Sequence, residues 1–360
     1  MARPITSQER VMAALNHARP DRIPRYDILF KSFTDNWRAA KNLPAEVDAA
    51  AHYRLDIPGL FAVQSGPFRS RALPEQRQGD FVVSRDTWGR TIRRLVDSGF
   101  SEVVSTAIEN KTDLDRLEFD DPGSPAYREA LPNLSGQTAY PYARVSGTMG
   151  LFQACTWLRG DIPFMINLLD DESFCRTLIG RLKDFLAVLG EQVARRTQTL
   201  DSAFWVYDDF SINTGPMISP DVFARLFLEP YRALLGHWKS IGIRHLILHH
   251  DILNDTTLPI IDMFLDAGIT GVQGVYPTAG LSLPRFKARY GKRLAVIGGM
   301  CNTHTLPFGS RADIERQAAA IVDAGRDGGV IIGSHSIEGY IPVANYDTYI
   351  GTLDRLENVG

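Results

Sequence analysis

The side chains best suited to chemistry in this chain follow short apolar segments of its second half. Segments 203–207, 244–248, 294–299 and 329–333 each end in polar residues, which are Asp208 and Asp209, then His249, His250 and Asp251, then Met300, Cys301 and Asn302, and finally Ser334 and His335. Carboxylates, imidazoles and thiols bind metal ions and transfer protons. If the apolar segments are parallel strands, their carboxyl ends bring these side chains to one pocket.

Helix-length amphipathic stretches separate the apolar segments. The expected strands are 143–146, 203–207, 244–248, 271–275, 294–297 and 330–332, and the expected helices lie near 161–197, 219–240, 255–267, 282–290 and 311–325. This alternation is typical of a parallel sheet. No GxGxxG or GxxxxGK[ST] motif opens a helix, which disfavours a nucleotide-binding doubly wound sheet. The sequence therefore predicts an α/β fold, with residues 1–360 forming a single (β/α)8 TIM-barrel domain.

The first half of the chain begins with a predicted helix and a first strand. Thr6 or Ser7 can cap a helix that ends near residue 17. Segment 21–30 is expected to be a strand that carries Asp27 to one side of the sheet, because side chains alternate along a strand.

Two irregular segments follow. Alternating residues between 79 and 99, around a turn at 86–89, predict a β-hairpin inserted into the repeated units. Segment 113–141, rich in Asp, Pro, Gly and Ser, is expected to be a loop with one short helix. Later, Ser219 and Pro220 form a strong helix start, and Pro230 should kink the helix that they begin.

Composition limits the classes of partner. The 39 basic and 42 acidic residues give a formal charge of -3 without a basic cluster, so nucleic acid is not expected as a partner. No signal peptide and no apolar run of about 20 residues is present, which predicts a cytoplasmic protein without a membrane partner. The three cysteines lack CxxC spacing, so neither a disulfide framework nor a thiolate-rich zinc site is indicated.

His249 and Asp251 are the first candidates for metal ligands. They lie two positions apart at a strand end, so both can face the barrel mouth while His250 faces the other way. Imidazole and carboxylate both bind Zn²⁺, and a catalytic zinc site takes about three protein ligands. His335 is the natural third ligand. The alternative is structural, with His249 neutral and hydrogen-bonded, Asp251 capping the next helix and His335 in a polar loop.

The remaining candidates are expected to act on the substrate. Asp209 and Asp27 are the expected catalytic residues, with Arg25 as an ion-pair partner for Asp27. The expected substrate-binding residues are Tyr207, Asp208, Trp88, Gln273, Tyr276 and Cys301. As alternatives, Asp208 and Asp209 anchor the turn at 213–215, and Cys301 is a small buried residue.

Several motifs resemble the uroporphyrinogen decarboxylase superfamily. These are PDRIP at 20–24, ISPDVFARLFLEPY at 218–231, HHD at 249–251, GGMC at 298–301, GSHSI at 333–337 and IPVAN at 341–345. The resemblance covers nearly the whole chain and implies a (β/α)8 barrel. It also implies one of two activities, which are cofactor-free decarboxylation of a tetrapyrrole and zinc-dependent methyl transfer to or from a corrinoid.

The chain departs from both patterns. Where the decarboxylases have an arginine-glycine-arginine-tyrosine type motif for substrate carboxylates, this chain has RYDI at 25–28. The methyltransferases bind zinc through His-x-Cys and a further Cys, whereas here Asp251 replaces the first Cys and a serine-histidine pair stands near the second. A His/Asp/His set is harder and suits polarisation of an oxygen. The missing decarboxylase motif and the DTWG turn at 86–89 make the chain more similar to the methyltransferase-type members than to the decarboxylases.

The leading hypothesis is a methyltransferase or O-demethylase. Zinc on His249, Asp251 and His335 would act as a Lewis acid on a small, methoxylated substrate. No DxHxxG cobalamin-binding sequence occurs, so the corrinoid is expected on a partner protein. The alternatives are a metal-independent decarboxylase, in which Asp27 stabilises a protonated intermediate, and a non-catalytic barrel that binds a small molecule. The sequence leaves open the substrate, the direction of transfer and whether two barrels pair as a homodimer.

Overall fold

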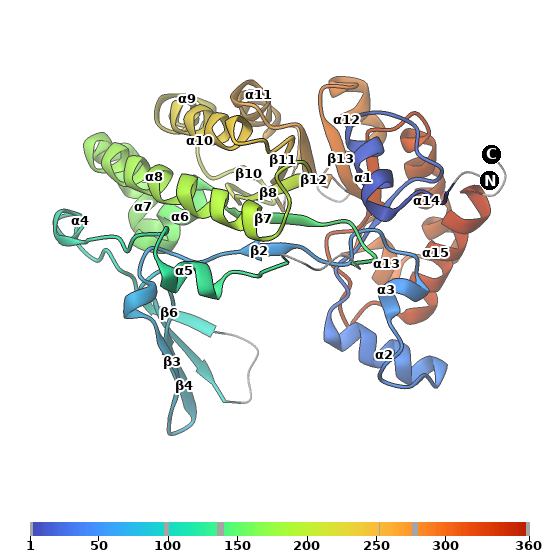
Figure 1. Ribbon diagram of the computed structural model, residues 1–360, viewed down its shortest axis with the longest axis horizontal. Coiled ribbons are helices and arrows are strands. Elements are labelled where there is room, and N and C mark those ends of the chain that lie inside the picture. The colour runs from blue at the N-terminus through green and yellow to red at the C-terminus, as the bar shows by residue number, and fades with distance from the viewer. Residues whose placement is uncertain (1–2, 97–100, 135–139, 252, 276–279, 358–360) are drawn as a thin grey trace.

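Eight parallel strands form one curled sheet in the computed structural model, which describes residues 3–96, 101–134, 140–251, 253–275 and 280–357 (Figure 1). The strands are β1 (Arg25–Tyr26), β2 (Phe61–Val63), β7 (Val145–Met149), β8 (Ala203–Tyr207), β11 (His245–His249), β12 (Gly271–Val275), β13 (Ala295–Gly299) and β14 (Val330–Gly333). Strands β2 to β14 pair in chain order, and β14 pairs with β1. A parallel bridge between Tyr26 and Ile57, just before β2, joins the two edges of the sheet. The predicted (β/α)8 barrel is confirmed.

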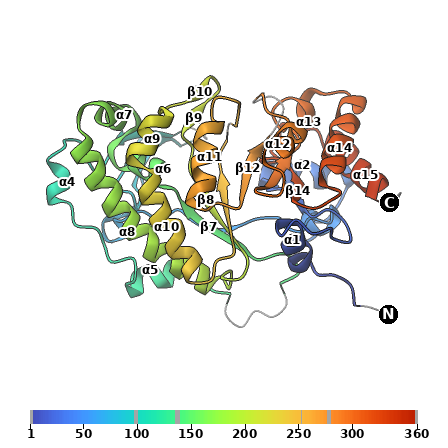
Figure 2. The same ribbon diagram turned by 90° about the horizontal axis from the view of Figure 1, so that it is seen from above.

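Helices follow the strands and cover the outside of the sheet, as Figure 2 shows for the larger ones. The larger helices are α8 (Glu172–Arg196), α10 (Leu228–Ser240), α11 (Leu258–Ala267), α12 (Leu283–Tyr290), α14 (Arg311–Gly325) and α15 (Val343–Glu357). The shorter ones are α2 (Lys31–Lys41), α3 (Ala49–His52), α6 (Leu151–Arg159), α7 (Asp161–Asp170), α9 (Pro220–Leu226) and α13 (Thr305–Phe308). None of the described helices is both long enough and apolar enough to cross a lipid bilayer.

The amino-terminal end of the barrel is covered by α1 (Ser7–Leu15). Thr6 and Glu9 form a capping box at its start, in agreement with the predicted cap. The Gln8 side chain bonds to the Arg144 amide and the Ser202 hydroxyl, which precede β7 and β8. The same apolar cluster holds Val11, Ala14 and Leu15 of α1 and the strand residues Tyr26, Ile57, Trp205, Ile247, Ile297 and Ile331. Packed side chains therefore fill this end of the barrel, and a reactive site is expected at the carboxyl ends of the strands.

The inserted hairpin is part of a larger sheet. β4 (Phe81–Arg85) and β5 (Thr91–Leu95) pair antiparallel around the predicted turn, and β3 (Leu73–Gln78) and β6 (Ser101–Ser105) extend the sheet at both edges. In β3 the sequence LPEQRQ is exposed throughout and lacks the alternation that marks a half-buried strand. Figure 1 shows this four-stranded sheet standing away from the barrel.

Several helix predictions need correction. The helix expected at 219–240 is two helices, because Pro230 has no amide for the Leu226 carbonyl and the chain breaks at Phe227. The helix expected near 161–197 is α7 and α8, separated at Asp171, whose side chain caps α8. Helix α6 is not among the predicted helices. The segment 113–141 holds two short helices, α4 (Asp113–Arg116) and α5 (Pro125–Ala130), instead of one.

Candidate metal centre

Two histidines and one aspartate converge at the carboxyl end of the barrel. His249 is the last residue of β11, Asp251 follows two residues later, and His335 lies two residues after β14. Asp251 Oδ1 is 3.3 Å from Nε2 of His249 and 3.3 Å from Nε2 of His335. The three candidate ligand atoms all lie within 4.8 Å of one another. The structure therefore brings together the three residues that the sequence predicts as metal ligands.

Strand alternation explains why His249, and not its neighbour, belongs to this cluster. His249 is the register partner of Tyr207 on β8 and of Gln273 on β12, and its ring centroid lies 4.7 Å from that of Tyr207. His250 faces the helices, where its ring stacks on Phe210 at 4.0 Å and its Nδ1 lies 2.9 Å from the Asp208 carbonyl oxygen. The last side chain of β11 and the one that follows it thus point to opposite faces.

The pKa shifts of Asp251 and His335 favour metal binding, whereas that of His249 means that a metal ion must displace a proton from this histidine. Burial opposes the negative charge of Asp251, but the His249 hydrogen bond and the nearby histidines outweigh it and lower the pKa of Asp251 to about 2. Burial, reinforced by His249, lowers the pKa of His335 to about 4. Burial also opposes protonation of His249, yet Asp251 and Asp209 raise its pKa. A carboxylate and neutral imidazoles are the forms that bind a metal ion.

The donor set fits a zinc ion. Tetrahedral Zn²⁺ with bonds of about 2.0–2.1 Å separates neighbouring ligand atoms by about 3.3–3.4 Å. Both imidazole–carboxylate separations are 3.3 Å, which matches this value, and the ligand atoms of the two histidines lie within 4.8 Å of each other. Two imidazoles and one carboxylate are a three-ligand set of the kind that leaves one position open for a substrate. His249, Asp251 and His335 are therefore the residues that would hold the ion.

Asp208 and Asp209, which follow β8, point to different sides of the sheet. Asp209 lies beside the cluster, and its Oδ1 accepts a hydrogen bond from the Asp251 amide at 3.0 Å. Burial and the Asp251 charge raise the pKa of Asp209 to about 6. Asp208 faces the helices, fully buried, and accepts hydrogen bonds from the Tyr231 hydroxyl and, at 2.7 Å, from the Gln153 amide. Asp208 thus connects α6 to α10 and does not join the ligand cluster.

Asp27 lies behind β14, between the sheet and α15. Its Oδ1 accepts from the Ser334 amide at 2.8 Å and from the Ser334 hydroxyl, and its Oδ2 accepts from the Tyr346 hydroxyl at 2.9 Å. Burial raises the pKa of Asp27 to about 6. The Arg25 guanidinium, expected to pair with Asp27, instead binds Asp354 at 2.7 Å and Glu357 at 2.8 Å. Asp27 therefore positions the residue that precedes His335.

Two of the expected substrate-binding residues are fully buried elsewhere. Trp88 donates a hydrogen bond to the Gln64 carbonyl at 2.7 Å and packs edge-on against Trp157. The Cys301 sulfur accepts a hydrogen bond from the His304 amide at 3.3 Å. Tyr276 lies outside the described residues. Neither Trp88 nor Cys301 joins the ligand cluster.

Gln273 lies in the barrel, directly against His249. Its side-chain oxygen is 2.6 Å from the Trp205 indole nitrogen and 3.1 Å from Nδ1 of His249. Its amide nitrogen donates to the Tyr26 hydroxyl at 2.9 Å. The sequence does not connect Tyr26 or Trp205 with the cluster. Its one indication is the polar Gln273 in the otherwise apolar strand GVQGV, because a buried glutamine needs hydrogen-bond partners.

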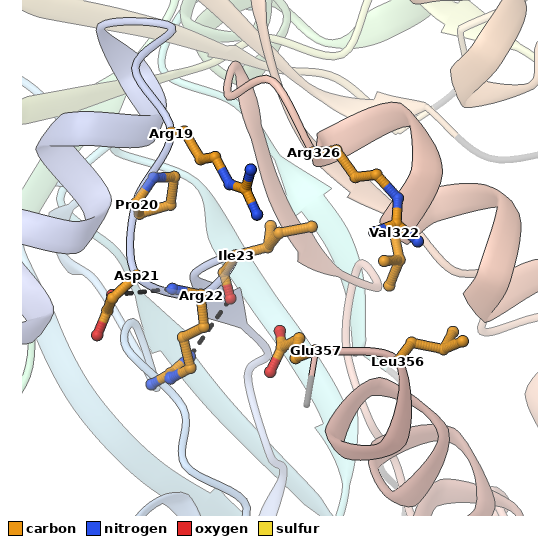
Figure 3. Close-up of a pocket in the computed structure, with 9 residues that line it drawn as sticks. All are labelled: Arg19, Pro20, Asp21, Arg22, Ile23, Val322, Arg326, Leu356 and Glu357. Carbon is orange, nitrogen blue, oxygen red and sulfur yellow. Dashed lines mark hydrogen bonds between the residues drawn. The ribbon is translucent and has the colours of Figure 1, made fainter. Parts of the chain in front are cut away.

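A separate pocket lies at the amino-terminal end of the barrel (Figure 3). It is lined by Arg19, Pro20, Asp21, Arg22, Ile23, Val322, Arg326, Leu356 and Glu357. Arg22 binds buried Asp56 at 2.7 Å, and Asp56 also binds Arg10 at 2.7 Å. The PDRIP motif at 20–24 thus connects α1 and β1 to the segment before β2, and its place in the fold is structural.

The fold is similar along the whole chain to that of a methyltransferase from Methanosarcina mazei, with a TM-score of 0.66, 15% sequence identity, and coverage of 98% of this chain and 99% of that chain. A B12-independent methionine synthase from Shewanella sp. W3-18-1 (10% identity, 75% of this chain and 70% of that chain) and a putative vitamin-B12 independent methionine synthase from Listeria monocytogenes (11%, 94% and 96%) are more distant, each with a TM-score of 0.38. No protein-family model and no curated protein matches the sequence. The full-length likeness and the sequence motifs agree on the fold, and the chain is a (β/α)8 protein with the fold of the Methanosarcina mazei methyltransferase.

Proposed function

We propose that this chain is a zinc-dependent methyltransferase of the uroporphyrinogen decarboxylase superfamily. It would move a methyl group between a small methoxylated molecule and a corrinoid carried by a partner protein. The observation that carries the proposal is the convergence of His249, Asp251 and His335 at the barrel mouth. The full-length likeness to a methyltransferase supports it. When bound, zinc supplies a Lewis acid that polarises an oxygen atom of the substrate.

The chain's own side chains would bind the substrate and manage a proton. In the demethylating direction the carbon–oxygen bond of the ether breaks, and the acceptor supplies the electron pair for the new bond to the methyl group. The ether oxygen keeps its bonding pair and takes a proton. Asp209, beside Asp251, would hold that proton next to the oxygen, and Tyr207 would form the wall of the site next to His249. Asp27 acts only through Ser334 and is a positioning residue.

The contacts of Arg25 argue against a decarboxylase of polycarboxylate substrates. Such a substrate requires fixed cations at the site. Arg25, at the place of the decarboxylase arginines, is fully buried between Asp354 and Glu357 and faces α15. The charges that shift the pKa values of Asp209, Asp251, His249 and His335 come from one another and from His250. Carboxylate and imidazole side chains attract a metal ion, whereas the carboxylates repel a carboxylate-rich ligand.

Metal content tests the proposal. The full-length protein, purified in zinc-containing buffer and then desalted, is expected to retain about one zinc ion per chain by elemental analysis. His249→Ala and His335→Ala should each lose it. His237→Ala is the matched control, because that histidine lies on α10 beside Glu191, and it should retain zinc. Zinc-free wild-type protein, or zinc retained by His249→Ala, would refute the proposal.

Activity is tested on the zinc-loaded protein with reduced cobalamin and methoxylated aromatic compounds. Methylcobalamin formation, followed by absorbance, is expected in the wild type and should fall with Asp209→Asn. Release of carbon dioxide from an acidic substrate in the presence of a chelator would support the decarboxylase alternative instead. Binding of these compounds without turnover would support the non-catalytic barrel.

A further inference from the structure

We infer that Gln273 is a positioning residue that fixes the tautomer of His249 and presents its Nε2 lone pair to the metal. The inference rests on the proposed metal site and concerns how that site is built. Gln273 is buried beneath His249, with an exposed fraction of 1%. It therefore reaches the chemistry only through the histidine.

The orientation of the Gln273 amide follows from its other two partners. The Trp205 indole nitrogen is a donor only, so the Gln273 atom 2.6 Å from it must be the oxygen. The amide nitrogen then lies 2.9 Å from the Tyr26 hydroxyl, to which it donates. The rings of Tyr26 and Trp205 are themselves stacked, at 6.5 Å between centroids. Rotating the amide would place its nitrogen, a donor, against the Trp205 indole nitrogen, which is also a donor, so the Gln273 oxygen stays on the side of His249.

This fixed oxygen decides which nitrogen of His249 carries the proton. Nδ1 of His249 is 3.1 Å from the Gln273 oxygen, which can only accept, so Nδ1 must donate. A neutral imidazole has one proton, and Nε2 is then left with its lone pair. That lone pair faces Asp251 Oδ1 at 3.3 Å. Two acceptors that face each other at this distance are satisfied either by a second proton on His249 or by a metal ion that displaces that proton.

The second histidine lacks comparable support among the described residues. Nδ1 of His335 is buried without a hydrogen-bond partner in that part of the chain. His249 is thus the ligand whose orientation is set before the metal arrives. In metal sites, the partner that orients a histidine affects affinity as well as geometry.

The local backbone also serves this contact. Gln273 and His249 are register partners on adjacent strands, and the His250 amide donates to the Gln273 carbonyl at 3.1 Å. The register between β12 and β13 shifts between Gln273 and Val275, where Gly274 has a φ of +115°. Bulges of this kind re-aim a side chain next to a site.

Zinc affinity of the full-length protein, measured by competition with a chromophoric chelator, tests the inference. Gln273→Met removes the acceptor with little change in side-chain size, and the zinc affinity of this variant is expected to be about 10- to 100-fold weaker than that of the wild type. Gln273→Glu keeps an acceptor for Trp205 and His249, so its zinc affinity should be close to that of the wild type. Gln317→Met, on α14, is the matched control and should bind as the wild type does. Unchanged affinity in Gln273→Met, or equal losses in Gln273→Met and Gln273→Glu, would overturn the inference.

A second measurement needs neither metal nor turnover. In protein labelled with ¹⁵N-histidine, treated with chelator and kept at a pH where His249 is neutral, the nitrogen shifts should show a protonated Nδ1 and an unprotonated Nε2 in His249, assigned by their loss in His249→Ala. This signal should change in Gln273→Met. An unprotonated Nδ1 in the wild type would refute the tautomer assignment even if zinc binds. Conversely, failure of the wild type to bind zinc would refute the proposed function and leave the tautomer to be decided by this spectrum.

Discussion

Asp27 and Asp251 are carboxylates at the same end of the barrel, yet their surroundings shift their pKa values in opposite directions. Asp27 receives hydrogen bonds from neutral groups only, so burial dominates and its pKa rises to about 6. Asp251 lies between two imidazoles, which outweigh its burial and lower its pKa to about 2. At neutral pH only Asp251 is strongly favoured as an anion, which suits a metal ligand.

The raised pKa of Asp27 predicts a pH-dependent stability. The native state holds this proton more tightly than the unfolded chain, so the stability that Asp27 contributes is complete below about pH 4 and is lost as pH rises through about 6. Two pKa units correspond to about 3 kcal/mol. Asp27→Asn removes this titration, so its free energy of unfolding relative to the wild type should rise by up to about 3 kcal/mol between those pH values. Urea unfolding in the presence of chelator measures it.

The prediction would be contradicted if the free energies of unfolding of Asp27→Asn and the wild type differed by the same amount at every pH. Asp184→Asn is a suitable control, because the Asp184 side chain is 76% exposed on α8 and is solvated in both the folded and unfolded states. Its stability should follow the wild-type pH profile.

The candidate ligands could be predicted from the sequence, whereas the neighbouring aspartates could not be placed. The spacing of His249 and Asp251 is informative because one histidine of the pair must face inward. Asp27 and Asp208 also follow strands, but both faces of a barrel strand are covered, so the sequence does not show which face receives a polar side chain. Both turn to the helices and bind Tyr346 and Tyr231.

At the scale of elements, the bulge in β12 leaves no room for a side chain at Gly274. A Cβ atom at Gly274 would lie 1.7 Å from the His250 carbonyl oxygen, and the φ of +115° is unfavourable for any other residue. Gly274→Ala is therefore expected to destabilise the protein by about 2 kcal/mol or more and to weaken zinc binding, because β12 must move away from β11. Urea unfolding and the chelator competition measure the two effects.

Gly236→Ala provides the comparison for that substitution. Gly236 lies in α10, and beyond the adjacent backbone of that helix no atom of the described residues lies within 4 Å of the position that an alanine methyl group would occupy. Alanine should therefore be neutral or stabilise by up to about 1 kcal/mol. If Gly274→Ala were as stable as Gly236→Ala, the bulge would not be the constraint that the backbone indicates.

The repeated strand–helix pattern is strong enough to predict the elements of the second half, but not those of the first. β1 and β2 have two and three residues, too few to show a period. In the part of the chain that the structure describes, the ring closes through the bridge between Tyr26 and Ile57 and the backbone hydrogen bonds beside it, which no local pattern could reveal. The break between α9 and α10, by contrast, follows from Pro230 because proline acts through its own missing amide.

At the scale of the whole molecule, the ligands tie distant parts of the chain together. Zinc that binds the folded state alone should raise its free energy of unfolding by about 2.7 kcal/mol at a free concentration of one hundred times Kd. Thermal or urea unfolding with and without zinc measures this in the wild type. His335→Ala should show little gain, and an equal gain in that variant would mean that the stabilising ion binds elsewhere.

The pairing of β1 with β14 has a consequence for the timing of assembly. Asp27, near the start of the chain, holds Ser334, and His335 is the last of the three ligands to be synthesised. While a chain is still growing on the ribosome, it offers His249 and Asp251 but neither the third ligand nor the closed ring that orients it. Capture of a metal ion would therefore mark the completion of the barrel, and a stalled or truncated chain would be recognisable by its failure to retain one.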